Sequence, residues 1–172
     1  MEIVRCTIND LDKLVDIKSI DRKHMIEEGN ITQWNGKDDD FIKEVTKFIK
    51  QNSFYIVKDD GKIVGMFALI LDVDHTYDII KDGKWLNDDK YVVIHKMGVK
   101  YFRKHIGSFI LNYVKKMAIS HNVHNIRIDT HKDNISMNNF LLYHGFKRCG
   151  IISINYDFND KNSLREAYQL II

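Results

Sequence analysis

The sequence Val99-Lys100-Tyr101-Phe102-Arg103-Lys104-His105-Ile106-Gly107-Ser108 is a basic turn with one glycine, and it follows an apolar strand predicted over residues 91–99. A strand that ends in a tight turn at a helix N-terminus leaves backbone N–H groups unpaired, and the helix dipole adds positive potential there. With Arg103 and Lys104 at the same point, the turn is predicted to hold a phosphate or pyrophosphate group. The helix after the turn is predicted from apolar residues at steps of three and four, the spacing of one buried face: Ile106, Phe109, Ile110, Tyr113, Val114 and Met117.

Two common nucleotide-binding motifs do not fit this turn. A Walker loop ends in Gly-Lys-Ser/Thr after a longer glycine-rich run, and the turn has neither feature. A Rossmann fingerprint has three glycines near the start of its fold, whereas Gly107 stands alone and past the middle of this chain. A phosphate site of another fold is therefore indicated.

A second pattern follows farther along the chain. Residues 127–131 are predicted to form the next strand, and Asn134 precedes a predicted helix that closes on Gly145-Phe146. Together with the turn at 99–108, these motifs resemble the GNAT superfamily of acetyl-CoA-dependent N-acetyltransferases. That family binds coenzyme A through an Arg/Gln-x-x-Gly-x-Gly/Ala loop and has an asparagine at the start of its second motif.

The resemblance implies an α/β fold: a mixed, mostly antiparallel central sheet with splayed strands, flanked by helices. At 172 residues with no break in composition, a single GNAT-like domain over residues 1–172 is expected. A hairpin turn at 59–62 and a strand at 3–6 agree with the entry to that fold. Further strands are expected at 54–57, 63–71, 125–130, 147–156 and 167–172, and further helices from Asp10, over 40–51 and from about Ser136.

The turn departs from the family pattern at two positions. Phe102 stands where the family has Arg or Gln, and His105 stands where it has the first glycine, so only Gly107 is retained. A β-carbon at His105 narrows the approach of a ligand to the backbone. The residues that the resemblance assigns to coenzyme binding are Met97, Gly98, Val99, Phe102, Arg103, Lys104, His105, Ile106, Gly107, Ser108 and Asn134.

An acetyl transfer needs a neutral amine, and a free lysine has a pKa near about 10.4, so a general base is required. Asp129 is favoured, because the family often places an acidic residue near the end of this strand, facing the acceptor. His95 and His131 are alternatives, since an imidazole titrates near neutrality. Each of the three could instead be a packed or hydrogen-bonded strand residue.

The general acid and the acceptor side are less defined. The family commonly has a tyrosine seven residues after the motif asparagine, where this chain has Leu141. Tyr143 lies two helical steps on, turned by about 200°. Gln33 and Trp34 are the candidates for acceptor binding, because the segment after the first helix borders the amine cleft in the family. Trp34 could equally cover the core beneath a loop.

Bulk properties exclude several classes. A net charge of +2 gives no basic field for nucleic acid. No apolar run approaches the roughly 20 residues needed to span a bilayer, and the N-terminus lacks a signal-peptide pattern. Cys6 and Cys149 have no spacing that suits a disulfide framework or a metal, and residues 72–75 lack the ligand spacing of a calcium loop. A cytoplasmic protein without a metal or membrane partner is expected, with a homodimer left open.

The predicted function is transfer of an acetyl group from acetyl-CoA to the primary amine of a small molecule or peptide, by direct attack. One alternative is a module that binds CoA or acyl-CoA without turnover, which Leu141 and the altered turn would favour. Another is an acetyltransferase that acts on protein N-termini or lysines.

Overall fold

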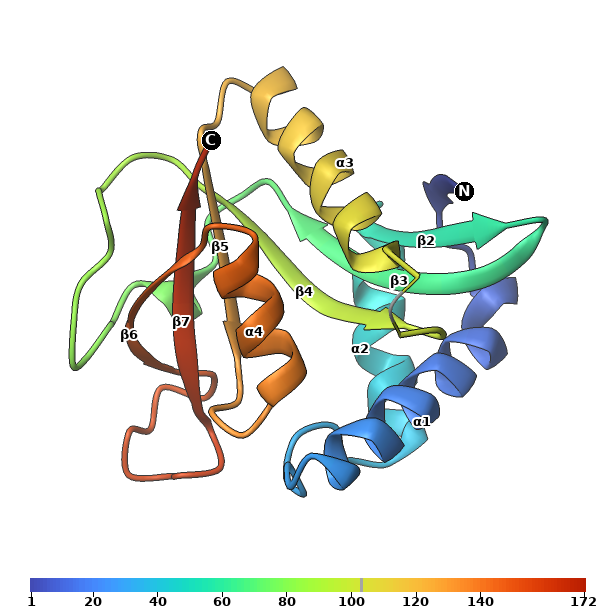
Figure 1. Cartoon of the computed structure of the whole chain (residues 1–172), viewed down its shortest axis with the longest axis horizontal. Coiled ribbons are helices and arrows are strands. Elements are labelled where there is room, and N and C mark those ends of the chain that lie inside the picture. The colour runs from blue at the N-terminus through green and yellow to red at the C-terminus, as the bar shows by residue number, and fades with distance from the viewer. Residues whose placement is uncertain (103) are drawn as a thin grey trace.

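The computed structural model describes residues 1–102 and 104–172, and Arg103 lies outside the described residues. The strands form one sheet in the order β1-β2-β3-β4-β5-β7-β6 (Figure 1). The strands are β1 Glu2–Arg5, β2 Phe54–Asp59, β3 Lys62–Ile70, β4 Val92–Val99, β5 Asn125–Thr130, β6 Lys147–Ser153 and β7 Leu164–Ile171. The helices are α1 Leu11–Glu27, α2 Asp38–Lys50, α3 Ile106–Ser120 and α4 Ile135–Tyr143, with short 3-10 helices η1 Ile8–Asp10 and η2 His75–Tyr77.

Strand pairing is antiparallel except between β4 and β5, which run parallel. A parallel pair needs a long crossover, and α3 supplies it. The predicted α/β domain with a mixed, mostly antiparallel sheet is confirmed.

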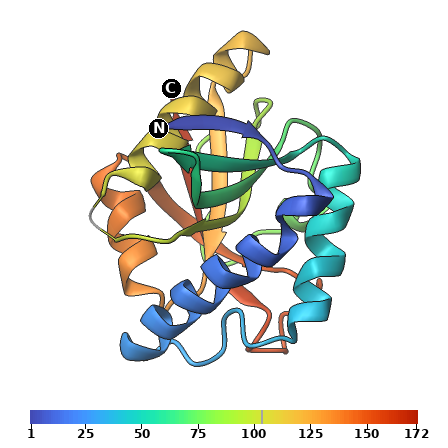
Figure 2. The ribbon, with the colours of Figure 1, turned by 90° about the vertical axis from the view of Figure 1, so that its right-hand side faces the viewer.

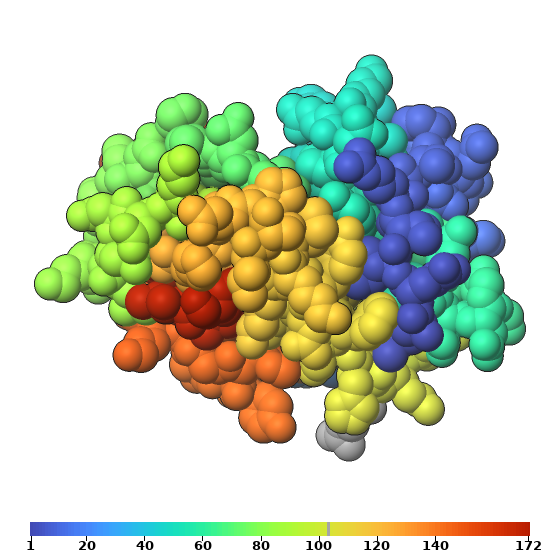
Figure 3. All heavy atoms as spheres, turned by 90° about the horizontal axis from the view of Figure 1, so that it is seen from above, coloured from blue at the N-terminus to red at the C-terminus, as the bar shows by residue number. Residues whose placement is uncertain are grey.

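Helices cover both faces of the sheet. Figure 2 shows α1 and α2 together on one side, and α3 on the other. Because both faces are covered, β2 buries successive residues rather than alternate ones. Tyr55 and Val57 pack into the core beneath α3, while Phe54 and Ile56 pack into the core formed with α1 and α2. Seen from above in Figure 3, α3 lies between β1 and the green segment that precedes β4.

The two parallel strands separate partway along their length. β4 and β5 pair only from Val92 with Ile126 to Ile94 with Ile128, although both strands continue beyond these residues. The expected splay is therefore present, and it opens the sheet at its middle.

A bulge in β4 lies at the start of this opening. The register with β3 pairs Met66 with Gly98 and Ala68 with His95, so β4 carries one extra residue between them. Lys96, inside the bulge, has a left-handed backbone with φ of 51°. Its ammonium is 2.7 Å from the carboxylate of Glu44 on α2, which ties the bulge to that helix.

Two strands differ by three residues from their predicted bounds, and the first is β6, which ends at Ser153 rather than at 156. β7 begins at Leu164 rather than at 167, because Arg165 and Glu166 pair with Ile152 and Ile151 of β6 although they are polar. The segment before β4, for which no helix or strand is expected, contains η2 and a β-bridge between Lys81 and Ile151. Hydrophobic periodicity gives no signal for either feature.

Candidate functional site

A cavity of about 1270 Å³ lies where β4 and β5 separate. Residues from α1, α2, α4, β7 and the N-terminus of α3 also line it. It brings together most of the residues that the sequence singled out: Gln33, Trp34, His95, Met97, Gly98, Val99, Phe102, Lys104, His105, Ile106, Gly107, Ser108, Asp129 and Asn134. His131 is not among the lining residues, and the prediction for Arg103 lies outside the described residues.

One end of the cavity is the N-terminus of α3. Within residues 1–102 and 104–172, the N–H groups of Ile106, Gly107 and Ser108 have no hydrogen-bond acceptor. A side chain at position 107 would place its β-carbon 3.0 Å from the ring of Phe140, so the absence of a side chain at Gly107 lets α3 pack closely against α4. Together with the cavity-lining Lys104, these donors form a site suited to a phosphate group.

His105 caps this helix in a left-handed conformation, with φ of 57° and ψ of 15°. The family pattern has its first glycine at this position. Glycine suits the position because it adopts a left-handed backbone conformation without steric cost. The imidazole of His105 is exposed and makes no capping hydrogen bond. The turn therefore contains a residue with a strained backbone whose side chain makes no capping hydrogen bond that would offset the strain.

The main chain of β4 is partly engaged by α1. The N–H of Val99 donates to the Asp21 carboxyl at 3.0 Å. Burial raises the pKa of Asp21 to about 8, against the opposing effect of that hydrogen bond. Gly98 lets the carboxyl come so close, because a β-carbon there would lie 2.6 Å from it. Val99 is among the residues that the resemblance assigns to coenzyme binding, and its N–H is already bound to Asp21.

Asn134 is engaged within the protein as well. Its side-chain oxygen accepts from the N–H of Met137 at 3.1 Å, which caps α4, and its amide donates to Gln33 at 3.1 Å. Gln33 accepts a second bond from Asn30 at 3.0 Å. Asn134 therefore joins α4 to the loop after α1 and fixes the side chain of Gln33 at the cavity wall.

Trp34 has a left-handed backbone with φ of 59°, and its ring packs toward Phe41 of α2 at 6.2 Å between centroids. Its ring edge lies close to Gly98, where a β-carbon would meet it at 3.1 Å. Trp34 thus covers the core beneath the loop and also lines the cavity.

The opposite end of the cavity holds a chain of acidic and basic groups. Nε2 of His95 lies 2.6 Å from the carboxylate of Asp74, and Nδ1 lies 3.8 Å from the carboxylate of Asp129. Burial alone would raise the pKa of Asp74, but hydrogen bonds from His95 and Thr76 outweigh this effect and lower the pKa to about 2. Asp74 is therefore an ionised acceptor, and Nε2 of His95 carries the proton between them.

Tyr77 continues this series of polar contacts into the core. Its hydroxyl donates to Asp129 at 2.6 Å, and its ring is 1% exposed and stacks on Trp85 at 5.6 Å. Burial and the nearby Asp129 raise the pKa of Tyr77 well above its ordinary value, so the hydroxyl stays a donor. Asp74 and Tyr77 were not predicted as site residues. Their segment has no periodicity, and only the folded chain brings them to His95 and Asp129.

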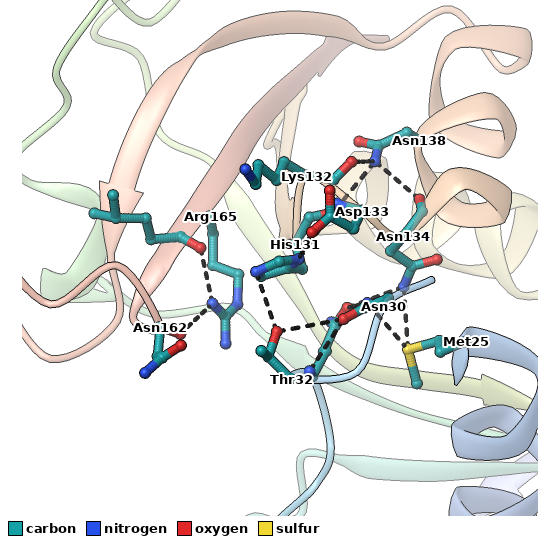
Figure 4. Close-up of polar contacts among 12 residues, drawn as sticks. Met25, Asn30, Thr32, His131, Lys132, Asp133, Asn134, Asn138, Asn162 and Arg165 are labelled. Carbon is teal, nitrogen blue, oxygen red and sulfur yellow. Dashed lines mark hydrogen bonds and ion pairs between the residues drawn. The ribbon is translucent and has the colours of Figure 1, made fainter. Parts of the chain in front are cut away.

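His131 lies apart from this group. The N–H of Asp133 donates to Nδ1 at 3.3 Å, so Nε2 carries the proton and donates to the Thr32 hydroxyl at 3.2 Å. Burial and the charge of Arg165 lower the pKa of His131, which favours this neutral form. Figure 4 shows His131 between the loop after α1 and the start of α4. Of the three predicted bases, the structure brings Asp129 and His95 together and uses His131 to join two loops.

The described residues contain no group of three or more His, Cys, Asp or Glu side chains arranged to hold a metal ion. Over the same residues, no helix combines the length and apolar character needed to cross a membrane.

Comparison with known proteins agrees with this geometry. Residues 19–146 match the model of the acetyltransferase (GNAT) family. A search of curated proteins gave no match. Among solved structures, a GNAT-family acetyltransferase from Streptococcus agalactiae is 24% identical with a TM-score of 0.81, over 99% of this chain and 95% of that one. A ribosomal-protein-alanine N-acetyltransferase from Brucella melitensis is 14% identical with a TM-score of 0.61, over 100% of both chains.

An aminoglycoside 6'-acetyltransferase type Ii has the same fold, with 17% identity and a TM-score of 0.63 over 99% of this chain and 97% of that one. At these identities the structural likeness establishes the fold, and the family model covers most of the chain. With the strand splay, the open helix N-terminus after β4 and the match over residues 19–146, this chain belongs to the GNAT acetyltransferase family.

Proposed function

We propose that this protein transfers an acetyl group from acetyl-CoA to a primary amine. The observation that carries the proposal is one cavity with a phosphate-suited helix N-terminus at one end and the His95–Asp129 pair at the other. The strand splay lies between the two ends, so a thioester held along β4 would meet an amine at His95. The two solved neighbours are named for transfer to a ribosomal-protein alanine and to an aminoglycoside, two different acceptors, so they support the reaction class only.

In the proposed reaction the amine nitrogen attacks the thioester carbonyl carbon. A carbon–nitrogen bond forms, the carbon–sulfur bond breaks, and coenzyme A leaves as the thiolate, which takes the second proton that the nitrogen loses as the amide forms. The acceptor enters as an ammonium ion, which Asp129 binds by charge. Because Nε2 of His95 is protonated against Asp74, the lone pair of Nδ1 takes the proton from the acceptor. His131 has no part in this proposal, since both of its ring nitrogens are engaged.

The imidazolium that forms would lie between two carboxylates. Asp74 lies 2.6 Å away on one side and Asp129 3.8 Å away on the other. Asp74 holds the ring in place through its hydrogen bond, and Asp129 lies on the side of the ring where Nδ1 is free. Tyr77 holds Asp129 in place from the core. This arrangement supports His95 as the base and Asp129 as the group that binds the amine.

The leaving thiolate has no tyrosine where the family commonly has one. Leu141 is 1% exposed and belongs to the core beneath α3, while Tyr143 is 87% exposed at the edge of the cavity. The thiolate of coenzyme A leaves without a protein acid at position 141. This is the observation that favours the second candidate, a module that binds CoA or acyl-CoA without turnover.

Acetyl-CoA and an amine acceptor are the only partners proposed, without nucleic acid, membrane or metal, and the cytoplasm is the proposed location. The acceptor is a small molecule or a peptide, and a protein N-terminus or lysine is a variant of the same reaction. A homodimer is proposed as the oligomeric state, and light scattering would test it by measuring the molar mass in solution.

The experiment measures thiol release from acetyl-CoA across a panel of amines, together with the melting temperature in acetyl-CoA and in CoA. Stabilisation by both, with thiol release that depends on the amine, is the expected result. His95→Ala should abolish the release, and Asp129→Asn should raise the KM for the amine. Stabilisation without release across the panel would support the binding module. No stabilisation by any CoA species would overturn both candidates.

A further inference from the structure

We infer that the acceptor carries a carboxylate beside its amine, and that Arg165 binds this carboxylate. The inference rests on the proposed acetyl transfer and adds a substrate class to it: amino acids, or peptides with an acidic group near the N-terminus. It starts from a cation in the cavity wall that the reaction itself does not use.

Arg165 lies at the start of β7 and lines the same cavity as His95 and Asp129. Its side chain is half-buried and fixed at one nitrogen, since Nη1 donates to the main-chain oxygens of Asn162 and Leu164, both at 2.8 Å. Figure 4 shows these bonds and the guanidinium beside His131 and Thr32. The group is therefore held in place by the backbone before β7.

Within residues 1–102 and 104–172, the rest of the guanidinium has no hydrogen-bond or ion-pair partner. Among the residues that the structure describes, nothing accepts a hydrogen bond from Nε or Nη2 of Arg165, and no carboxylate lies within ion-pair distance of it. Burial lowers the pKa of Arg165, while Asp129 and Asp160 raise it from a greater distance. A half-buried cation without an adjacent carboxylate has lost part of its hydration, and the two main-chain hydrogen bonds from Nη1 compensate for only part of that loss. A bound carboxylate would supply that compensation through two parallel hydrogen bonds.

Sheet register places Arg165 near the amine end of the site. β5 and β7 pair antiparallel, with Asp129 opposite Ala167 and Thr130 opposite Glu166. Residues two apart in a strand point to the same face, so Arg165 shares the face of Ala167 and of Asp129. Such diagonal neighbours lie about 7–8 Å apart.

The two charges are therefore complementary to one small zwitterion. Asp129 attracts the ammonium ion, and Arg165 attracts a carboxylate a few ångströms from it. A simple alkylamine would use only half of this site. An α-amino acid, or an N-terminal residue with an acidic side chain, would use both.

The test compares matched acceptors with the wild-type protein. Each of the common amino acids is assayed beside its amide and its decarboxylated amine, by thiol release from acetyl-CoA. A second set compares dipeptides with and without a carboxylate on the first two side chains. The amino acid or the acidic dipeptide should exceed its uncharged counterpart in kcat/KM by about tenfold or more, because charge-assisted hydrogen bonds are lost with the carboxylate. Whichever set shows the preference identifies the source of the carboxylate.

Arg165→Gln should remove this preference mainly through KM, and it should leave the decarboxylated amines within about twofold of wild type. Lys47→Gln is the matched control, because Lys47 lines the same cavity from α2. Arg165→Lys keeps the charge but not the planar fork, and it should retain part of the preference. It also serves if the glutamine variant does not fold.

Equal kcat/KM for acids, amides and amines in the wild-type protein would overturn the inference while the proposed function stands. So would a preference that Lys47→Gln removes and Arg165→Gln does not. Failure to acetylate any amine would instead contradict the proposed function itself.

Discussion

The substitution His105→Gly should stabilise the protein. His105 holds the start of α3 with φ of 57°, and its exposed ring makes no capping bond. A left-handed backbone costs a residue with a β-carbon roughly 1–2 kcal/mol. Glycine removes this cost but loses about 0.5–1 kcal/mol more conformational entropy on folding. The net gain in the free energy of unfolding is then about 0.5–1 kcal/mol, which for a chain of this size raises Tm by about 1–4 °C.

The same substitution should strengthen coenzyme binding. Without a β-carbon at position 105, a pyrophosphate can come closer to the N–H groups of Ile106 and Gly107. Calorimetry with CoA should give a lower Kd for His105→Gly than for wild type. The rise in Tm tests the backbone strain of the free protein, and the lower Kd tests the approach of the pyrophosphate to the backbone.

His105→Ala is the control, because alanine removes the ring but keeps the β-carbon and its strain. It should melt at or below the temperature of wild type, and His105→Gly should melt above both. The reasoning is refuted if the two variants melt together, since left-handed strain would then not set the stability of this turn. It is equally refuted if glycine lowers Tm.

Three further predictions concern buried acids and Tyr77. Asp74→Asn should lower kcat by about 100-fold with little change in the KM for the amine, because the imidazolium of His95 loses its carboxylate partner. Steady-state kinetics that show an unchanged kcat would contradict this. Tyr77→Phe should lower the free energy of unfolding by about 1–3 kcal/mol in urea, since Asp129 loses a buried donor; unchanged stability would count against that bond. The pKa of Asp21 is about 8 in the folded protein against an ordinary value of 3.8, so the folded state holds the proton more tightly and stability falls as pH rises between these values. Asp21→Asn should therefore flatten the dependence of Tm on pH in this range. An equal pH dependence in wild type and variant would remove Asp21 as its source.

The coenzyme end of the site was largely predictable from the sequence. Apolar spacing gave the helix after the turn, and Ile106, Ile110 and Val114 are buried as that spacing requires. A strand, a basic turn and a helix in succession fix the direction of the free N–H groups by local geometry alone. Such features depend on neighbouring residues, which a sequence displays directly.

The acceptor end depends on contacts between distant segments. Asp74 reaches His95 across 21 positions, and Tyr77 reaches Asp129 across 52. Nothing in the local pattern of residues 72–90 indicates these contacts. Their segment is ordered by tertiary packing, above all by Trp85, whose indole N–H donates to the main-chain oxygen of Tyr77 at 3.0 Å.

His131 shows how a strand boundary changes a prediction. Asp129 and His131 are two positions apart, so a continuous strand would point both into the cavity. β5 ends at Thr130, and the chain then turns toward α4. His131 therefore faces the loop of Thr32 instead. A difference of one residue in the end of the strand separates a candidate base from a residue that joins two loops.

The bulge at Lys96 explains how one strand serves both ends of the cavity. In a regular strand His95 and Met97 would point to the same face. Here the ring of His95 stacks on Phe48 of α2 at 6.3 Å, while Met97 contacts the position of Gly107 at the start of α3. The extra residue and the left-handed φ of Lys96 turn the strand between them. His95, the proposed base, is thus directed toward α2, and the main chain after it runs toward the start of α3. This one irregularity in β4, anchored by Glu44, separates the proposed acceptor end of the cavity from the proposed coenzyme end.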